Sequence, residues 1–255
     1  MSVFVSAAEL NERIQTGQKQ TIIAALWEPK EGKAWSKFQS EHIPTALYCD
    51  PSVQLAGLPG RAAGRNPLPS IDVVRKAAAG WGIEDGRPVY IYDGGNGLFA
   101  ARAWWILRWA GVTDVHILDG GFATWDGEGF PTVAGPGGIV VPRDVELTEG
   151  SLPSATMEDV RAFEGLLIDA RGARRFQGLR EILDLRAGHI PGARNLPVND
   201  LFDPETHKVK DTDTIRDRFS QLGVTQNTDP ASVITYSGSG NHSALLLAAM
   251  EHAGL

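Results

Sequence analysis

The fold is decided by a six-residue motif that occurs twice. Glu-His-Ile-Pro-Thr-Ala at residues 41–46 returns as Gly-His-Ile-Pro-Gly-Ala at residues 188–193, 147 positions later. A short apolar run precedes each copy and another follows it, at residues 21–25 and 165–170, and at residues 89–92 and 233–236. Three landmarks that keep their order and nearly the same spacing indicate a duplicated domain.

Within each copy, short apolar strands alternate with helical segments. Residues 100–110 are rich in Ala, Leu, Trp and Arg and end at Gly111, as a helix with a glycine stop does. Residues 6–9 match a capping box that begins a helix, and residues 115–118 are strand-like. This alternation predicts an α/β fold in which a mainly parallel sheet carries helices on both faces.

The repeat also predicts where the domains lie. We expect an N-terminal domain at residues 1–135, a linker rich in Gly and Pro at residues 136–150, and a C-terminal domain at residues 151–255. The second copy lacks the last strand and helix of the first, because the chain stops after the helix that precedes them.

Composition excludes several classes of protein. The 255 residues include 24 Lys and Arg against 31 Asp and Glu, a net charge of −7, which argues against a general nucleic-acid or anionic-membrane binder. One cysteine forbids an intramolecular disulfide and a cysteine-cluster metal site. The longest apolar stretch, residues 244–250, is far shorter than the ~20 residues of a membrane span, and no signal peptide is evident. We therefore expect a soluble cytoplasmic protein without a metal or cofactor.

The segment best suited to chemistry lies between a strand and a helix of the second copy. It reads Ser237-Gly238-Ser239-Gly240-Asn241-His242. A glycine-rich loop of this kind turns successive backbone N–H groups into one concavity, and the positive end of the following helix favours an anion there. The alternative is a tight strand–helix turn built from small residues.

The duplicated layout, the repeated His-Ile-Pro motif and this loop resemble the tandem-domain rhodaneses, which are thiosulfate and 3-mercaptopyruvate sulfurtransferases. The resemblance covers nearly the whole chain and includes Asp169-Ala170-Arg171, Tyr92-Asp93-Gly94 and the turn at residues 119–122. It implies two rhodanese-like domains, with the active site in the second. It also implies transfer of a sulfane sulfur from a small anionic donor, thiosulfate or 3-mercaptopyruvate, through a loop persulfide to a thiol or cyanide acceptor.

The chain departs from the family pattern at the nucleophile. Active members begin the loop with cysteine, whereas this chain has Ser237. A serine hydroxyl is far less acidic than a thiol and is a poor nucleophile toward sulfur, so we expect no turnover by the family mechanism. The lone Cys49 lies in a strand-like run with no glycine loop behind it, which predicts a buried and inert thiol.

The resemblance also implies roles for other residues around the loop. Arg186 and Arg175 resemble arginines that anchor the anionic end of the donor, since a guanidinium fork suits a carboxylate or thiosulfate. Ser239 resembles a serine that relays a proton. Gly238, Gly240, Asn241 and His242 are placed to contact a bound anion.

Three other interpretations were weighed. Residues 95–100 fit the G-x-G-x-x-A pattern of a dinucleotide-binding turn, but that turn should come at the start of its domain. A serine hydrolase requires G-x-S-x-G, which neither Ser237 nor Ser239 satisfies. A non-catalytic rhodanese-fold binding or regulatory module is favoured by Ser237 and by the missing C-terminal elements, and it remains the alternative.

Overall fold

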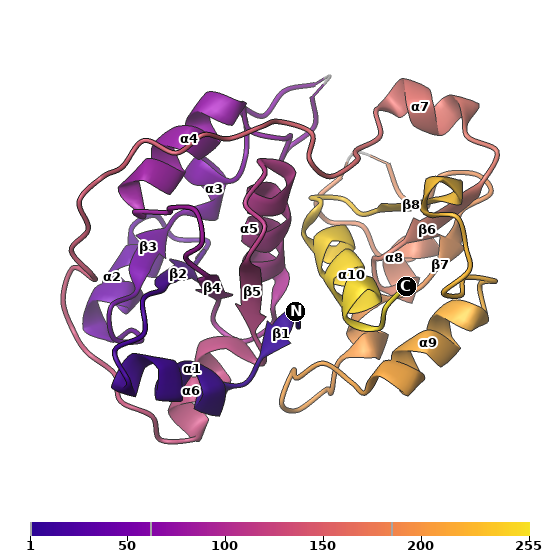
Figure 1. Cartoon of the computed structure of the whole chain (residues 1–255). Coiled ribbons are helices and arrows are strands. Elements are labelled where there is room, and N and C mark those ends of the chain that lie inside the picture. The colour runs from indigo at the N-terminus through magenta and orange to yellow at the C-terminus, as the bar shows by residue number, and fades with distance from the viewer. Residues whose placement is uncertain (1, 62, 185) are drawn as a thin grey trace. The chain divides into compact units, whose positions relative to one another are not determined.

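The chain divides into unit 1, Met1–Pro153, and unit 2, Ser154–Leu255 (Figure 1). The structure, a computed structural model, describes residues 2–61, 63–184 and 186–255. Both units are α/β, with mainly parallel sheets flanked by helices, as the sequence predicts.

Unit 1 is built on a five-stranded sheet in which every strand pair is parallel. Its strands are β1 (Phe4–Val5), β2 (Thr21–Ala25), β3 (Leu47–Cys49), β4 (Val89–Tyr92) and β5 (Val115–Leu118), in the spatial order β1-β5-β4-β2-β3. Its helices are α1 (Ala7–Gln15), α2 (Lys33–Ser40), α3 (Pro51–Gln54), α4 (Ile71–Gly80), α5 (Leu98–Trp109) and α6 (Gly121–Gly127). All residues of β2, β4 and β5 are buried, which explains their near-continuous apolar runs.

Unit 2 repeats the centre of that sheet. Its strands are β6 (Leu166–Asp169), β7 (Arg194–Asn195) and β8 (Val233–Tyr236), in the parallel order β7-β6-β8. Its α-helices are α7 (Met157–Ala162), α8 (Ala173–Phe176), α9 (Thr212–Ser220) and α10 (Asn241–His252), with 3-10 turns at Val198–Leu201 and Pro230–Ser232. The order β8-β6-β7 corresponds to β4-β2-β3 of unit 1.

The described residues of unit 2 contain no counterpart of β5 or α6, which follow α5 in unit 1. Strand β8 pairs with β6, whereas its counterpart β4 lies between β2 and β5. All four residues of β8 are consequently half-buried, while those of β4 are fully buried.

The repeated motif performs the same structural work in both units. His42 Nδ1 lies 2.8 Å from the carbonyl oxygen of Phe38, and its ring stacks on that phenyl ring. His189 repeats both contacts with Phe176. The next residue of each motif donates its backbone N–H to a tyrosine hydroxyl at the end of a strand, Ile43 to Tyr92 and Ile190 to Tyr236. The histidines therefore fasten the motif to the preceding helix, α2 or α8, and the isoleucine N–H groups fasten it to the sheet.

Residues 136–150, predicted as the linker, lie within unit 1. The chain before them pairs Val133 with His42 through two backbone hydrogen bonds of 2.9 Å. At Gly137, with φ +94°, a Cβ atom would lie 2.7 Å from the Ala46 carbonyl oxygen and 2.8 Å from the Phe38 ring. Only glycine permits this approach, so the Gly-Pro-Gly-Gly composition serves close packing against the domain.

Candidate active site

Ser237 is the first residue after β8, at the carboxyl end of the strand. Ligands of parallel α/β sheets bind at this end. Gly240, with φ +82°, is the N-cap of α10 and turns the chain from strand to helix within three residues of Ser237. A left-handed residue at this position favours glycine.

The Ser237 hydroxyl lies in a cradle of backbone N–H groups. Its Oγ accepts the N–H of Gly240 at 3.0 Å and that of Ser243 at 3.4 Å. The Ser243 hydroxyl lies 3.4 Å from it and donates to the Gly240 carbonyl oxygen at 3.0 Å. Because these N–H groups belong to the start of α10, the Ser237 oxygen faces the positive end of that helix.

Unit 1 contains the same cradle around a carboxyl group. Asp93 follows β4, and its buried carboxylate accepts four backbone N–H groups. Two of them, from Gly97 at 3.0 Å and Ala100 at 3.3 Å, come from the N-cap and third residue of α5. Gly240 and Ser243 occupy these two positions of α10. Burial raises the pKa of Asp93, and the four N–H groups act in the opposite direction and lower it. The loop fold that surrounds Ser237 therefore directs its N–H groups at an acidic side chain elsewhere in the same chain.

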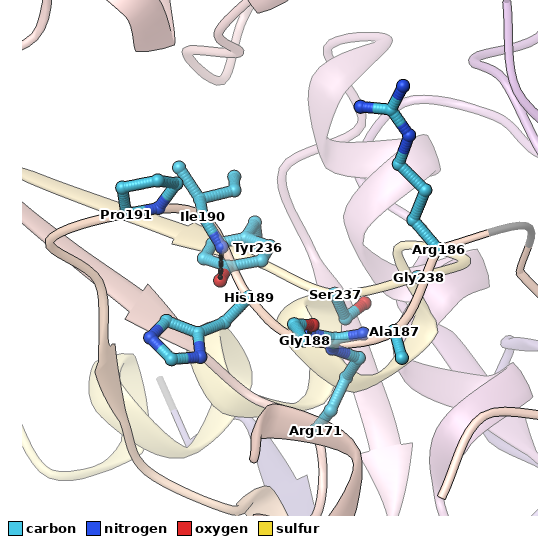
Figure 2. Close-up of a pocket in the computed structure, with 10 residues that line it drawn as sticks. All are labelled: Arg171, Arg186, Ala187, Gly188, His189, Ile190, Pro191, Tyr236, Ser237 and Gly238. Carbon is cyan, nitrogen blue, oxygen red and sulfur yellow. Dashed lines mark hydrogen bonds between the residues drawn. The ribbon is translucent and has the colours of Figure 1, made fainter. Parts of the chain in front are cut away.

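A pocket of about 380 Å³ opens beside Ser237 and is formed entirely by unit 2. Figure 2 shows its lining residues: Arg171, Arg186, Ala187, Gly188, His189, Ile190, Pro191, Tyr236, Ser237 and Gly238. Two arginines supply its positive charge. Arg186 is exposed, forms no ion pair with the described residues, and extends away from Ser237 in Figure 2.

Arg171 is the pocket cation that the sequence analysis did not assign to the site. Its side chain is 7% exposed, and its fork makes a bidentate pair with the fully buried Asp169, at 3.0 Å to Oδ1 and 2.6 Å to Oδ2. Its Nη2 also donates to the Gly188 carbonyl oxygen at 2.7 Å, which fixes the pocket rim. The hydrogen bond to Asp169 raises the pKa of the Arg171 guanidinium. The available signal was the Asp-Ala-Arg sequence at the end of an apolar strand.

Arg175 is held by carboxylates and does not line the pocket. Its guanidinium makes a bidentate pair with Glu181, at 2.8 and 3.2 Å to one oxygen, and contacts Asp184 at 2.7 Å. The Glu181 carboxylate also accepts three backbone N–H groups from residues 182–184. The N–H group of Leu183, then Arg175 and the N–H group of Asp184, lower the pKa of Glu181 to about 2.

The remaining loop residues surround Ser237 without all reaching the pocket. Gly238 lines it, and Gly240 supplies an N–H to the cradle. Ser239 Oγ lies 3.5 Å from the backbone N–H of Asn241. Asn241 and His242 are the first two residues of α10 and are not among the lining residues. Burial raises the pKa of Tyr236, whose hydroxyl holds Ile190, to about 12.

The model of the rhodanese-like domain family matches residues 6–128 and again residues 154–255, which together make up most of the chain. The chain belongs to the rhodanese family. SseB of Mycobacterium tuberculosis is 32% identical over 99% of this chain and 89% of its own length. The thiosulfate sulfurtransferase of Gallus gallus is 29% identical over 86% of this chain and 78% of its own.

A solved structure is similar along the same length. SseA from Escherichia coli, described with the 3-mercaptopyruvate sulfotransferases, superimposes with a TM-score of 0.82 at 30% identity. The match covers 99% of this chain and 95% of SseA. The homologues of this rhodanese are thus sulfurtransferases of the thiosulfate and 3-mercaptopyruvate type.

The only cysteine of this rhodanese belongs to unit 1, whereas the Ser237 loop belongs to unit 2. Cys49 is the last residue of β3 in unit 1 and is fully buried. Burial, with a smaller contribution from the Asp50 carboxylate, raises the pKa of its thiol well above the usual value. A buried thiol with a raised pKa is a poor nucleophile.

The described part of the chain has no cluster of metal ligands and no free dinucleotide-binding turn. No group of three or more His, Cys, Asp and Glu side chains among these residues could hold a metal ion. In the Gly-rich turn of unit 1, the N–H groups of Gly95 and Gly97 already donate to Asp93, so a pyrophosphate would have to displace that carboxylate.

No described helix has both the length and the apolar character needed to cross a bilayer.

Proposed function

We propose that unit 2 is the sulfur-transfer unit of this rhodanese, and that Ser237 occupies the position of its nucleophile. One observation carries the proposal: Ser237 Oγ accepts the two backbone N–H groups that correspond to those holding the Asp93 carboxylate. A cradle of this kind stabilises a thiolate and the terminal sulfur of a persulfide. The donor is a small anion, thiosulfate or 3-mercaptopyruvate, and the acceptor is a thiol or cyanide.

With cysteine at position 237 the reaction balances in two steps. The thiolate attacks the sulfur of 3-mercaptopyruvate, an S–S bond forms and the C–S bond breaks. The electron pair of that bond leaves with the carbon as the pyruvate enolate, which then takes a proton. Cyanide or a thiolate next attacks the outer sulfur, so that the S–S bond breaks and the cysteine thiolate is regenerated. With thiosulfate, the first step breaks its S–S bond and releases sulfite.

Ser237 stops this sequence at the first step. Its hydroxyl keeps the volume and the hydrogen bonds of the nucleophile position, but it lacks the soft, ionisable sulfur that accepts a sulfane sulfur. The unmodified chain is therefore expected to bind the donor without turning it over.

The charge around the pocket favours 3-mercaptopyruvate as donor. The loop from Gly238 to Gly240 contains no basic side chain that would meet the second charge of thiosulfate. Arg186 at the rim is unpaired among the described residues and suits a single carboxylate. We expect Arg186 to anchor that carboxylate, while Arg175 stays engaged by Glu181 and Asp184.

The test is thiocyanate formation from cyanide with each donor. Ser237→Cys should form thiocyanate, and faster from 3-mercaptopyruvate than from thiosulfate. The unmodified chain and Ser237→Ala should not exceed the uncatalysed rate of thiocyanate formation. Ser239→Cys is the matched control, because it places a thiol in the same loop two residues away from position 237. Turnover by the unmodified chain would contradict the argument on serine.

A folded but inactive Ser237→Cys variant would favour the second candidate, a non-catalytic binding module. That candidate is supported by Ser237 itself, which keeps the cradle and removes the nucleophile. Calorimetric titration of the unmodified chain with 3-mercaptopyruvate or sulfite would then show binding that is lost in Arg186→Ala.

A further inference from the structure

The chain beside the pocket displays apolar side chains to solvent. We define the rim segment as the described residues 174–184, which begin in α8, together with the pocket-lining Arg186. Three of its aliphatic side chains are exposed: Leu179 by 69%, Ile182 by 75% and Leu183 by 60%. None of them lines the pocket, so they do not serve a small molecule bound there.

An internal ion network engages both acidic side chains of the rim segment, of which Glu181 is buried and Asp184 is 31% exposed. Glu181 is 5% exposed at its side chain, and its carboxylate takes up the N–H groups of residues 182–184 as well as the Arg175 fork. Asp184 accepts from the same guanidinium. The carboxylates that would solubilise an ordinary loop are therefore engaged below it, and the aliphatic side chains are left facing water.

The other exposed side chains of the rim segment are three arginines and Gln177. Arg174, Arg180 and Arg186 are exposed, and their side chains have no ion pair or hydrogen bond to any described residue. The whole chain carries a net charge of −7, so these arginines form a positive surface on an acidic protein. Such a surface complements a negatively charged partner and steers its approach.

We infer that the rim segment is the docking surface for an acidic protein that carries the acceptor thiol. This inference rests on the proposed function and names its macromolecular partner. A small acceptor fits within about 380 Å³ in a pocket that Ile182 and Leu183 do not line, whereas a protein whose thiol enters beside Arg186 is large enough to contact the rim segment as well. Its surface would be acidic around an apolar patch, to match arginines around aliphatic side chains.

A protein partner fits better than a nucleic acid. Single-stranded nucleic acids bind where bases stack on free aromatic rings beside basic side chains. Phe176 is the aromatic residue of the rim segment, and its ring already stacks on His189 with centroids 3.7 Å apart. The exposed apolar residues are aliphatic and offer bases no ring on which to stack.

Binding is tested on the unmodified chain by fluorescence polarisation. The probe is a labelled peptide in which Glu and Leu residues flank a single Cys. It should bind, more weakly as salt rises, and about tenfold more weakly to Ile182→Ser/Leu183→Ser and to Arg174→Glu/Arg180→Glu. The matched control is Met157→Ser, which removes an aliphatic side chain of 57% exposure from α7 and should leave binding unchanged.

Three outcomes would overturn the inference. Equal binding to the rim variants and to Met157→Ser would show that the rim segment takes no part. If a peptide with Lys in place of Glu binds as tightly as the acidic peptide, charge complementarity does not select the partner. Tighter binding of a single-stranded RNA than of the acidic peptide would assign the surface to nucleic acid.

Transfer assays separate this inference from the proposed function. In the Ser237→Cys background, the rim variants should keep the rate of thiocyanate formation and transfer sulfur to the peptide thiol about tenfold more slowly. An inactive Ser237→Cys protein would count against the proposed function alone, because the peptide-binding comparison requires no turnover. Equal transfer to the peptide by all rim variants would refute the docking surface while the sulfur chemistry stands.

Discussion

Replacing Arg171 with methionine should destabilise unit 2 and leave unit 1 unchanged. Arg171 and Asp169 form a pair whose side chains are 7% and 0% exposed. In Arg171→Met the Asp169 carboxylate keeps the backbone N–H of residue 171 but loses the guanidinium fork. The Gly188 carbonyl oxygen at the pocket rim loses its donor in the same change.

The expected cost follows from burial. Removing one partner of a buried ion pair costs about 3–5 kcal/mol, because the other charge remains in a poorly solvated site. Domains of this size are commonly stable by only about 5–15 kcal/mol, so the variant loses a large share of its stability. A loss of this size lowers hydrogen-exchange protection by about two to four powers of ten, since 1.4 kcal/mol corresponds to a factor of ten.

The distribution of tryptophan provides the assay. All seven tryptophans lie in unit 1, so their fluorescence follows the unfolding of that unit alone. Hydrogen exchange of peptides that cover β6 and β8 reports unit 2. Arg171→Met should lower the protection of β6 and β8 while the urea midpoint from tryptophan fluorescence stays unchanged.

Two controls isolate the buried charge. Arg161→Met breaks the pair with Glu158, whose side chains are 67% and 72% exposed, and should cost no more than about 1 kcal/mol. Asp169→Asn/Arg171→Met removes both charges and should recover part of the loss. The reasoning is refuted if Arg171→Met costs as little as Arg161→Met, or if the double variant is less stable than the single one.

Three further predictions concern single side chains. Arg186→Ala should weaken the binding of 3-mercaptopyruvate, measured by calorimetry, by about 1.5–3 kcal/mol. Arg186→Lys should recover part of this affinity, because the lysine ammonium is a point charge and lacks the guanidinium fork. Equal affinities of the unmodified chain and Arg186→Ala would show that Arg186 does not bind the donor. Because burial raises its pKa, Cys49 should react slowly with a thiol reagent in the native protein and rapidly in denaturant, and rapid native labelling would contradict its burial. The pKa of Glu181 falls from 4.5 to about 2 on folding, so its contribution to stability is present above pH 4.5 and is lost as pH falls toward 2. The difference in urea midpoint between the unmodified chain and Glu181→Gln, followed by far-UV circular dichroism, should shrink over that range, and a difference independent of pH would exclude the carboxylate as its source.

The sequence by itself determined the duplicated parallel fold, because the signals involved are local. Apolar runs such as residues 89–92 and 233–236 indicate buried strands wherever they occur, and the repeat of His-Ile-Pro established their order twice. The loop at Ser237 could be located in the same way, since a glycine-rich turn between a strand and a helix has a recognisable composition. The similarity between the Ser237 loop and the Asp93 cradle could not be predicted from the sequence. That similarity depends on which N–H groups of α5 and α10 face the two side chains.

Tertiary structure decided which charged groups are free and which segments pack. Composition predicts a linker at residues 136–150. The close approach of Gly137 to the Phe38 ring, which leaves no room for a Cβ atom, is set only in the folded domain. The resemblance assigns both Arg175 and Arg186 to the donor, and nothing in their local sequence distinguishes them. They differ because the backbone at residues 181–184 folds around the Glu181 carboxylate and brings it to Arg175, while Arg186 lies beyond that turn. An ion pair depends on distances between side chains, and those distances are set only when the loop closes.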